Sequence, residues 1–509
     1  MFAQVYGSTT IGINGTLVTV EADIASGIPA FDIVGLADGS VRESKERVRA
    51  AIKNTGFEFP SRRITVNLAP ADIKKGSSGL DLPIAVAILA ASGQLNAEFC
   101  KNYVFAAELS LEGRLREIVG ILPMSIDCFE HKFKKMMVAA ENAQEALLAG
   151  ALEIYAPKDL NEVAAHLEGQ SPLKPIEKNT ILQTPSIIDD FADVQGQFVA
   201  KRALEIAAAG GHNILMTGPP GSGKTMLARR MPSILPEMTA AEALETTKIY
   251  SIAGLLKANS GLVTQRPFRN PHNTASDAGM VGGGRIPRPG EVTLSHNGVL
   301  FLDELPEFPR VVLEALRQPL EDGEVNISRI NASFCFPAKF MFVAAMNPCP
   351  CGRSNDGTQN CSCSEIEIKR YHKRISGPLL DRIDINIFVP RLEYTDIAGK
   401  SEEEPSSQIK KRVEAARKIQ TERLKNWKIS SNSQMTHKHI KELCILSNES
   451  QKLLEQAFHK MNLSARGYDR VIKVAQTIAD LDKSLHINAT HIAEAIQFRN
   501  DAKIAIRRA

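Results

Sequence analysis

The sequence predicts an α/β protein of three parts, of which the first two are mixed α/β and the last is helical. Short strands alternate with helical stretches over the first part of the chain. In the middle part, two apolar runs of strand length, 214–217 and 298–302, lead into a glycine-rich turn and into a pair of acidic residues. Apolar residues at helical spacing mark the last part.

The bulk composition restricts the class of protein. A chain of 509 residues has room for about three domains, and 43% apolar with 23% charged residues argues against long disorder. The net charge of +3 is too small to indicate a nucleic-acid partner by itself, so any basic surface must be local. No apolar run reaches the roughly 18 residues of a membrane span, and the first residues lack the features of a signal peptide. We therefore expect a cytoplasmic protein.

Composition shifts place the boundaries between the parts. We expect residues 1–165 to form the first domain and 166–190, which are rich in proline, glycine and polar residues, to form a linker. The second domain is expected at 191–395 and the third at 396–509, after a polar break near 401–405.

Within the first domain we expect strands at 15–22 and 63–68 and helices at 40–52 and 81–91. The strands are rich in β-branched residues. The first helix has a charged outer face, and the second is apolar with Pro83 in its first turn.

Two stretches of this domain resemble the proteolytic domain of Lon-type proteases, whose α/β fold is the ribosomal S5 domain 2-like fold. Residues 74–79 resemble the loop that carries the nucleophile, and 113–120 resemble the strand before the catalytic lysine. Ser78 stands in the nucleophile loop and would need a lysine to deprotonate it. The matching positions, residues 121–123, offer no base. We expect a Lon-protease-like domain that lacks the Ser–Lys dyad and has no protease activity.

The second domain is built around a P-loop, the pattern Gly-x-x-x-x-Gly-Lys-Thr between a strand and a helix. Glycines let backbone N–H groups wrap a triphosphate, and the helix directs its positive end at the phosphates. We predict that Lys224 contacts the β and γ phosphates of ATP and that the Thr225 hydroxyl binds Mg²⁺. The predicted nucleotide-binding residues are Gly218, Pro219, Pro220, Gly221, Ser222, Gly223, Lys224, Thr225 and Met226.

Two later strands end in polar residues that complete this chemistry. Asp303 follows the second apolar strand and is predicted to hold Mg²⁺, and Glu304 beside it to deprotonate the attacking water. Asn347 ends a strand at 340–346 and is predicted to help orient that water.

A long irregular insert precedes Asp303, and a hairpin-like stretch, 325–336, precedes Asn347. These features resemble the helix-2-insert/pre-sensor-1 hairpin branch of AAA+ ATPases, which holds MCM helicases and magnesium-chelatase motors. A segment at 193–197 with the helix after it resembles the AAA+ segment that packs against adenine. Together with the Lon-like part, essentially the whole chain resembles the ComM/YifB family of magnesium-chelatase-like proteins. The resemblance implies a homo-hexameric ATPase that migrates DNA branches during natural transformation, with recombination proteins as further partners.

The stretch 371–384 resembles the segment of this branch that carries the arginine finger, and Arg382 matches the finger best, with Arg374 as the alternative. A finger inserted from a neighbouring subunit stabilises charge in phosphoryl transfer. The other interpretation of Arg382 is a surface ion pair with Asp381 or Asp384.

The third domain is expected to be the α-helical lid of an AAA+ protein. One helix opens near residue 464, and Arg466 at its start resembles the second sensor that contacts the nucleotide, with Arg470 one turn on as the alternative. Its apolar stripe is formed by Val471, Val474, Ala475, Ile478 and Leu481.

Two pairs of cysteines flank a polar loop at 349–363. Four thiolates, from Cys349, Cys351, Cys361 and Cys363, would form a tetrahedral structural Zn²⁺ site. The spacing of one residue within each pair is shorter than usual, so four reduced cysteines that bind no metal remain the alternative. The other four cysteines are scattered and expected to be packing residues.

The inserts also carry candidates for contacts with DNA. Strand binding without sequence preference needs basic and stacking groups, and Phe268, Arg285, Arg288 and Arg329 offer them. The alternative for each is an ordinary solvated loop. The leading hypothesis is thus a ring-forming DNA motor, a branch-migration helicase, and the alternative is a protein-remodelling motor of the magnesium-chelatase type.

Overall fold

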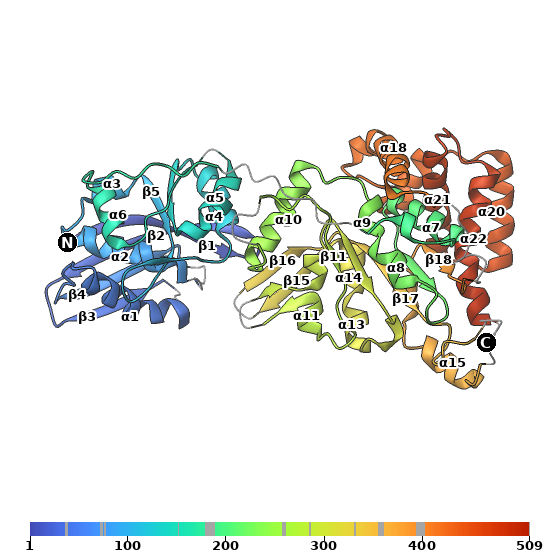
Figure 1. The fold of residues 1–509 in the computed structure, drawn as a ribbon, viewed down its shortest axis with the longest axis horizontal. Helices are drawn as coiled ribbons and strands as arrows, with labels where there is room; N and C mark the ends of the chain where they lie inside the picture. Colours follow the sequence, from blue (N-terminus) through green and yellow to red (C-terminus); the bar gives the residue numbers. More distant parts are fainter. Residues whose placement is uncertain are drawn as a thin grey trace.

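A computed structural model describes residues 1–35, 39–71, 75, 78–150, 152–178, 189–256, 261–284, 287–329, 332–354, 361–392 and 403–507. Figure 1 shows an elongated molecule with the N-terminal residues at one end, a mixed α/β part in the middle and a helical part at the other end. Among the described residues, no helix combines the length and the apolar content needed to cross a membrane.

The N-terminal part is built on a seven-stranded sheet in the order β3-β4-β2-β1-β5-β8-β9. These strands are β1 (Phe2–Ile11), β2 (Asn14–Ala25), β3 (Ala30–Val34), β4 (Arg63–Ala69), β5 (Tyr103–Ala106), β8 (Lys135–Val138) and β9 (Glu153–Tyr155). Its helices include α1 (Gly39–Asn54), α2 (Asp81–Ala91), α4 (Ile121–Glu130), α5 (Ala143–Ala146) and α6 (Leu160–Leu167). The strands and helices expected from the sequence are confirmed.

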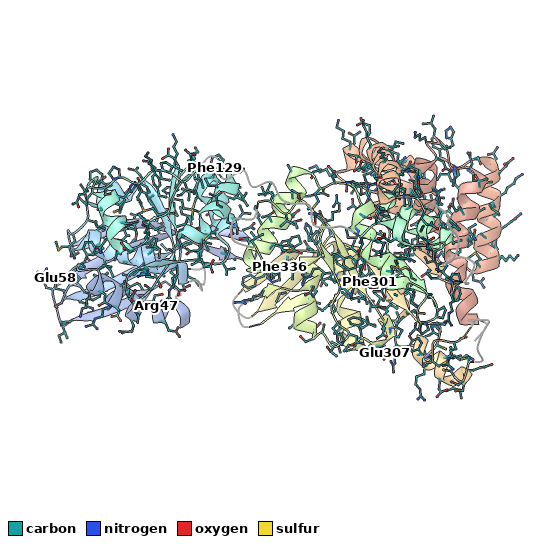
Figure 2. The ribbon with its side chains drawn as sticks, viewed as in Figure 1. Arg47, Glu58, Phe129, Phe301, Glu307 and Phe336 are labelled. Atoms are coloured by element: carbon teal, nitrogen blue, oxygen red, sulfur yellow. The ribbon has the colours of Figure 1, made fainter. Side chains whose placement is uncertain are left out.

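Helix α2 is the centre of this part and is buried along its whole length, as its apolar composition predicts. Its first residue, Asp81, is fully buried and receives two charge-assisted hydrogen bonds, at 2.7 and 3.1 Å, from Arg47 of α1. The guanidinium of Arg47, labelled in Figure 2, therefore fastens α1 to α2.

The middle part is a five-stranded sheet in the order β11-β14-β17-β10-β18, in which every pairing is parallel. Its strands are β10 (Ile214–Thr217), β11 (Phe268–Arg269), β14 (Val299–Leu302), β17 (Met341–Met346) and β18 (Ile385–Phe388). In a parallel sheet the carboxyl ends of the strands meet at one edge, where ligands bind. Here that edge collects the segments after β10, β14 and β17.

Helices and small hairpins surround this sheet. The helices include α7 (Phe198–Gly210), α8 (Lys224–Arg229), α10 (Ala240–Ile252), α11 (Asp277–Val281), α13 (Arg310–Ala315), α14 (Arg317–Asp322), α15 (Glu365–His372) and α16 (Gly377–Leu380). The hairpins are β12 (Gly282–Gly283) with β13 (Arg288–Pro289), and β15 (Glu324–Arg329) with β16 (Ala332–Pro337). The second hairpin leads into β17, as the alternating pattern at 325–336 predicts.

Contacts between the described residues of the N-terminal part and the middle part include the following two. The turn between β1 and β2 brings Ile13 into the same apolar cluster as Phe334 of β16 and Phe336, which is labelled in Figure 2. Ser251 of α10 donates a hydrogen bond of 2.5 Å to Glu145 of α5.

The C-terminal part is helical, with α18 (Ser406–Leu424), α19 (His437–Leu443), α20 (Asn448–Met461), α21 (Ala465–Leu481) and α22 (Ala489–Arg507). The predicted stripe on α21 lies in the apolar cluster that also holds α7 and strands of the middle sheet. This shared cluster fixes the helical part against the sheet.

Candidate nucleotide-binding site

The glycine-rich turn lies between β10 and α8, which is the strand–loop–helix arrangement that the sequence predicts. Gly223 has a φ of 90°, in the left-handed region that favours glycine. A Cβ on Gly218 would lie 2.2 Å from the carbonyl oxygen of Val389, so only glycine fits there. The turn therefore needs glycine at both ends.

Lys224 is buried beneath this loop. Its Nζ donates to the carbonyl oxygens of Gly218 at 2.7 Å and Pro219 at 2.8 Å, and lies 3.4 Å from Oδ1 of Asn347. Burial lowers the pKa of Lys224 to about 8, although the nearby carboxylates of Asp303 and Glu304 oppose this shift. A desolvated ammonium whose hydrogen-bond partners are three carbonyl oxygens and the Ser222 hydroxyl, all uncharged, fits a bound phosphate, whose charge would offset the desolvation.

The Thr225 hydroxyl and the Asp303 carboxylate converge beside the lysine. Oγ1 of Thr225 donates to Oδ2 of Asp303 at 2.6 Å, and Asp303 follows directly after β14. Hydroxyl and carboxylate oxygens are ligands that Mg²⁺ prefers, so this pair fits the ion that accompanies ATP. Lys224, Thr225, Asp303 and Asn347 are thus brought together as the sequence predicts.

Glu304 has a backbone conformation that is rare for a residue with a side chain. Its φ is 52°, and its amide donates to Oδ1 of Asp303 at 2.9 Å. Such strain is frequent at functional sites. Nδ2 of Asn273 lies 3.5 Å from the Glu304 carboxylate. The sequence gives no sign of this neighbour, because Asn273 belongs to the irregular insert.

The predicted arginines lie elsewhere. Arg382, just after α16, forms an ion pair with Glu321 and donates to the carbonyl oxygen of Pro378 at 2.7 Å. Burial, together with the positive charge of Arg466 and Arg470 among others, lowers the pKa of Arg382. The ion pair is therefore not with Asp381 or Asp384, the partners considered from the sequence.

Arg382, Arg466 and Arg470 all line a cavity of about 1110 Å³ between the sheet and the helical part. Residues 218–226, 303–304 and 347 are absent from its lining. Arg466 therefore does not line a common cavity with the P-loop residues of its chain, and its contact with a nucleotide stays a prediction. Arg470 is held by Asp384 at 3.1 Å, and Arg374, the alternative finger, pairs with Glu307 at 2.8 Å.

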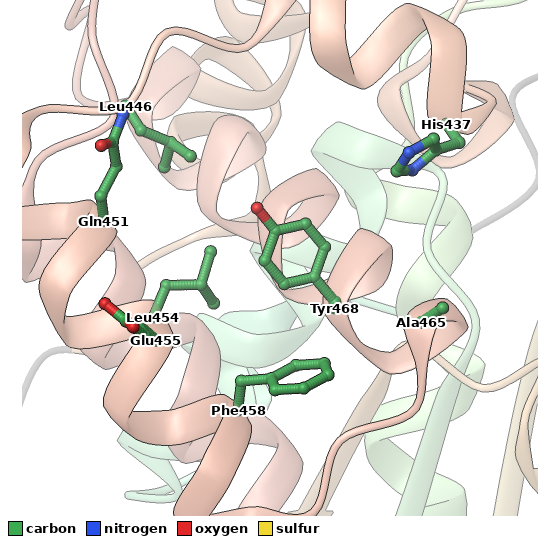
Figure 3. Close-up of a pocket in the computed structure, with 8 residues that line it drawn as sticks. All are labelled: His437, Leu446, Gln451, Leu454, Glu455, Phe458, Ala465 and Tyr468. Carbon is green, nitrogen blue, oxygen red and sulfur yellow. The ribbon is translucent and has the colours of Figure 1, made fainter.

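A second, apolar hollow of about 510 Å³ lies within the helical part (Figure 3). Its walls include Leu454, Phe458 and Tyr468, and the two rings meet edge to face with centroids 6.2 Å apart. None of the predicted site residues lines it, so it does not extend the nucleotide site.

The candidate DNA contacts that the structure describes lie on three strands of the middle part. Phe268 belongs to the edge strand β11 and not to a free insert, and its ring stacks on Phe301 at 6.0 Å. Its side chain is half-buried and packs against the apolar cluster of the sheet. Arg288 is exposed in β13, and Arg329 is the last residue of β15. Arg285 lies outside the described residues.

Four sulfur atoms gather at the end of β17. Sγ atoms of Cys349, Cys351, Cys361 and Cys363 all lie within 4.8 Å of one another, so the cluster could hold a metal ion. The scattered cysteines behave differently: Cys100 and Cys128 are buried in the N-terminal part, as packing residues, whereas Cys335 is exposed on β16.

Comparison with known proteins accounts for nearly the whole chain. Family models described as magnesium chelatase subunit ChlI match residues 20–142, 190–397 and, for its C-terminal region, 403–499. The Competence protein ComM of Haemophilus influenzae is 45% identical over 502 residues, which cover 98% of this chain and 97% of that protein. The uncharacterized protein YifB of Salmonella typhimurium is 42% identical over 504 residues, again 98% and 97%. The chain belongs to the ComM/YifB family.

Members of the ComM/YifB family are AAA+ motor proteins related to magnesium chelatase, which implies ATP and Mg²⁺ as cofactors. The P-loop, the Thr225–Asp303 pair and the buried ammonium of Lys224 fit both. The family models fall on the three structural parts in turn: the N-terminal sheet, the parallel sheet and the helical part.

This ComM/YifB chain also resembles a protease. Lon protease 2 of Bacillus subtilis is 31% identical over 145 residues, which are 26% of each chain. Ser78 of the predicted nucleophile loop opens a short 3-10 helix, and residues 121–123 begin α4 with Ile-Leu-Pro. Lys75 of the same loop is fully buried and donates to the carbonyl oxygens of Leu68 and Gly35 at 3.0 and 3.2 Å.

Proposed function

We propose that this protein is an ATP-driven, ring-forming DNA motor, and more narrowly a branch-migration helicase that acts on recombination intermediates in natural transformation. The observation that carries the proposal is the separation of two groups of residues. Lys224, Asp303 and Asn347 meet at one edge of the sheet, whereas Arg382 lines a different cavity. A finger that does not face its own nucleotide is available to the site of a neighbouring copy.

Each residue at the sheet edge then has a defined task. Lys224 binds the β and γ phosphates, and Thr225 with Asp303 holds Mg²⁺. Glu304 accepts a proton from the attacking water, which Asn347 helps to orient. Mg²⁺ held by these two residues would neutralise charge that develops on the phosphates. Arg382 of an adjacent copy stabilises the remaining negative charge, with Arg466 beside it in the same cavity.

The assembly proposed is a homo-hexamer, because a closed ring gives every site a neighbour that supplies its finger. The insert that holds α11 and β12–β13, and the hairpin β15–β16 ahead of Asn347, support membership of the helix-2-insert/pre-sensor-1 hairpin branch. The similarity to Lon protease 2 supports a Lon-like N-terminal domain without the dyad. Recombination proteins as partners and a cytoplasmic location remain predictions.

DNA is proposed as the substrate on two grounds. The Haemophilus influenzae relative is named a competence protein, and competence concerns the uptake of DNA. Arg288 is exposed on the hairpin β12–β13, Arg329 is the last residue of β15, and basic groups can track a nucleic-acid backbone without reading its sequence. Arg285 stays a candidate from the sequence alone.

The decisive experiment measures ATP hydrolysis by the full chain alone, with single-stranded DNA and with a four-way junction. Lys224→Ala serves as the negative control. We expect DNA to stimulate hydrolysis and the stimulation to fall as salt rises, since cations bound to DNA are released on binding. Robust hydrolysis that is indifferent to DNA, with no DNA binding at low salt, would contradict a DNA motor.

The alternative is a motor that remodels a protein, as the family models named for a magnesium chelatase subunit favour. Such a motor would hydrolyse ATP without a response to DNA. The same measurement therefore separates the two functions.

A further inference from the structure

The four-cysteine cluster lies directly against the nucleotide site. Cys349 follows Asn347 by two residues, and the turn through Cys351 places Gly352 on the P-loop. A Cβ on Gly352 would lie 2.5 Å from Cδ of Pro220 and 3.9 Å from Cγ of Asn347. The backbone of the cysteine loop is therefore in contact with the P-loop and with the residue predicted to orient water.

The sulfur atoms have the spacing of a tetrahedral metal site. Sγ of Cys349 lies 3.4 Å from that of Cys351 and 3.6 Å from that of Cys361, and the latter two are 3.6 Å apart. Four thiolates at about 2.3 Å from a Zn²⁺ ion are about 3.8 Å from one another, whereas a disulfide is only about 2.0 Å long. The amide of Ser354 donates to Sγ of Cys349 at 3.4 Å, an outer hydrogen bond of the kind that orients metal ligands.

A second contact joins the segment after the cysteine loop to the end of β17. Cys363 is followed by Ser364, which caps α15 by accepting a hydrogen bond from the amide of Glu367. At the other end of α15, Nε2 of His372 lies 3.0 Å from the carbonyl oxygen of Pro348, the residue between Asn347 and Cys349. Pro348 and His372 are thus joined by a hydrogen bond, and the cluster brings Cys361 and Cys363 to the end of β17.

We propose that Cys349, Cys351, Cys361 and Cys363 bind a structural Zn²⁺ ion that holds Asn347 and Pro220 in place for ATP hydrolysis. Thiolates are soft ligands that suit zinc, and four of them leave no position for a substrate, so the ion acts through the positions of the loops. Only the effect on hydrolysis rests on the proposed function. Metal binding and loop order are independent of it.

Metal content is the first test. Full-length protein, purified without chelators or added metal, is analysed for zinc and iron by inductively coupled plasma mass spectrometry. We expect one Zn²⁺ per chain in the wild type. The double variant Cys361→Ser/Cys363→Ser should bind none, and Cys335→Ser, which removes an exposed cysteine outside the cluster, should keep its zinc. A wild-type protein that carries no zinc, or carries iron instead, would overturn the proposal.

Loop order is the second test, and it uses the wild-type sequence in case the double variant fails to fold. Zinc is removed by dialysis against 1,10-phenanthroline, and hydrogen–deuterium exchange is compared before and after. We expect residues 217–226 and 341–352 to lose protection while residues 39–54 keep theirs, and both changes to reverse when Zn²⁺ is restored. Unchanged exchange at 217–226 would show that the metal does not support the P-loop.

Hydrolysis is measured on the same samples. We expect zinc removal to lower the rate by about 10²-fold, which is typical of a misplaced group at a reacting centre, and zinc to restore it. If zinc-loaded protein hydrolyses no ATP, the proposed function fails, while the zinc count and the exchange data still decide the present proposal.

Discussion

At the scale of single residues, Lys224 is a group whose positive charge is disfavoured by burial in the absence of a bound anion. Its ordinary pKa of 10.5 falls to about 8 through burial. A lysine with a lowered pKa in the folded state makes folding less favourable below that pKa, and the loss is recovered as pH rises from about 8 towards 10.5. A bound triphosphate reverses this preference because it supplies negative charge beside the ammonium.

ATP binding should therefore take up a proton near and above pH 8, and affinity should fall as pH rises through that value. Isothermal titration calorimetry at pH 8.5, in two buffers of different ionisation enthalpy, measures the uptake. Lys224→Arg is the matched control, since a guanidinium stays charged at this pH and takes up no proton. Equal heats in both buffers for the wild type would contradict the prediction.

Glu304 gives a second prediction at this scale. Glu304→Gln keeps the size of the side chain but removes the base, so we expect ATP affinity to persist while hydrolysis falls by about 10²–10⁴-fold. Nucleotide binding and turnover, measured on the same preparation, separate the two effects. Glu98→Gln removes an exposed carboxylate that pairs only with Lys101 in the described structure, and should leave both unchanged. A parallel loss of binding and turnover in Glu304→Gln would argue against the role of a base.

At the scale of elements, the turn at Gly352 joins the cysteine loop to the P-loop. Gly352 has a φ of 77°, and a Cβ there would press on the Pro220 ring. Gly169 has nearly the same backbone, with a φ of 73°, but nothing within 4 Å of the Cβ position. Alanine substitutions at the two glycines can therefore be compared directly, because the backbone conformation is nearly the same and only the Cβ at position 352 would contact another residue.

Gly352→Ala and Gly169→Ala should each lose about 1–2 kcal/mol of stability from the left-handed backbone. Only Gly352→Ala should weaken nucleotide binding, because only there must the P-loop shift. Thermal unfolding and titration with a fluorescent ATP analogue check the two statements. Normal affinity in Gly352→Ala would show that the contact has no influence on the nucleotide.

At the scale of the whole molecule, the separation of Arg382 from Lys224 predicts complementation between variants. Lys224→Ala loses the phosphate contact of its own chain, and Arg382→Ala loses the finger that it would give to a neighbour. Each alone should be inactive, and a mixture should recover part of the activity, because some interfaces in a mixed ring contain both wild-type groups. Hydrolysis of the mixture, followed against mixing ratio, measures this. A mixture as inactive as its components would place both residues in one chain's site.

The sequence predicts the parts of this site that depend on neighbouring residues in the chain. Lys224, Thr225 and Asp303 follow apolar strands in a parallel sheet, so their meeting at one edge follows from the topology. Phe268 could not be placed in the same way, since its strand has only two residues and resembles a loop. The convergence of Arg382 and Arg466 depends on how the helical part packs on the sheet, which local patterns do not specify. The contact of Gly352 with Pro220 could not be predicted from the sequence for the same reason.

The apolar cluster that holds both Ile13 and Phe334 has a mechanical consequence. The first turn of the chain is pinned to the hairpin β15–β16, the same hairpin that leads into Asn347 at the nucleotide. If hydrolysis shifts that hairpin, the shift pulls on the end of a ten-residue strand at the centre of the N-terminal sheet. The N-terminal sheet would then move together with the hairpin in each cycle of hydrolysis, and a molecule bound to that sheet would move with it.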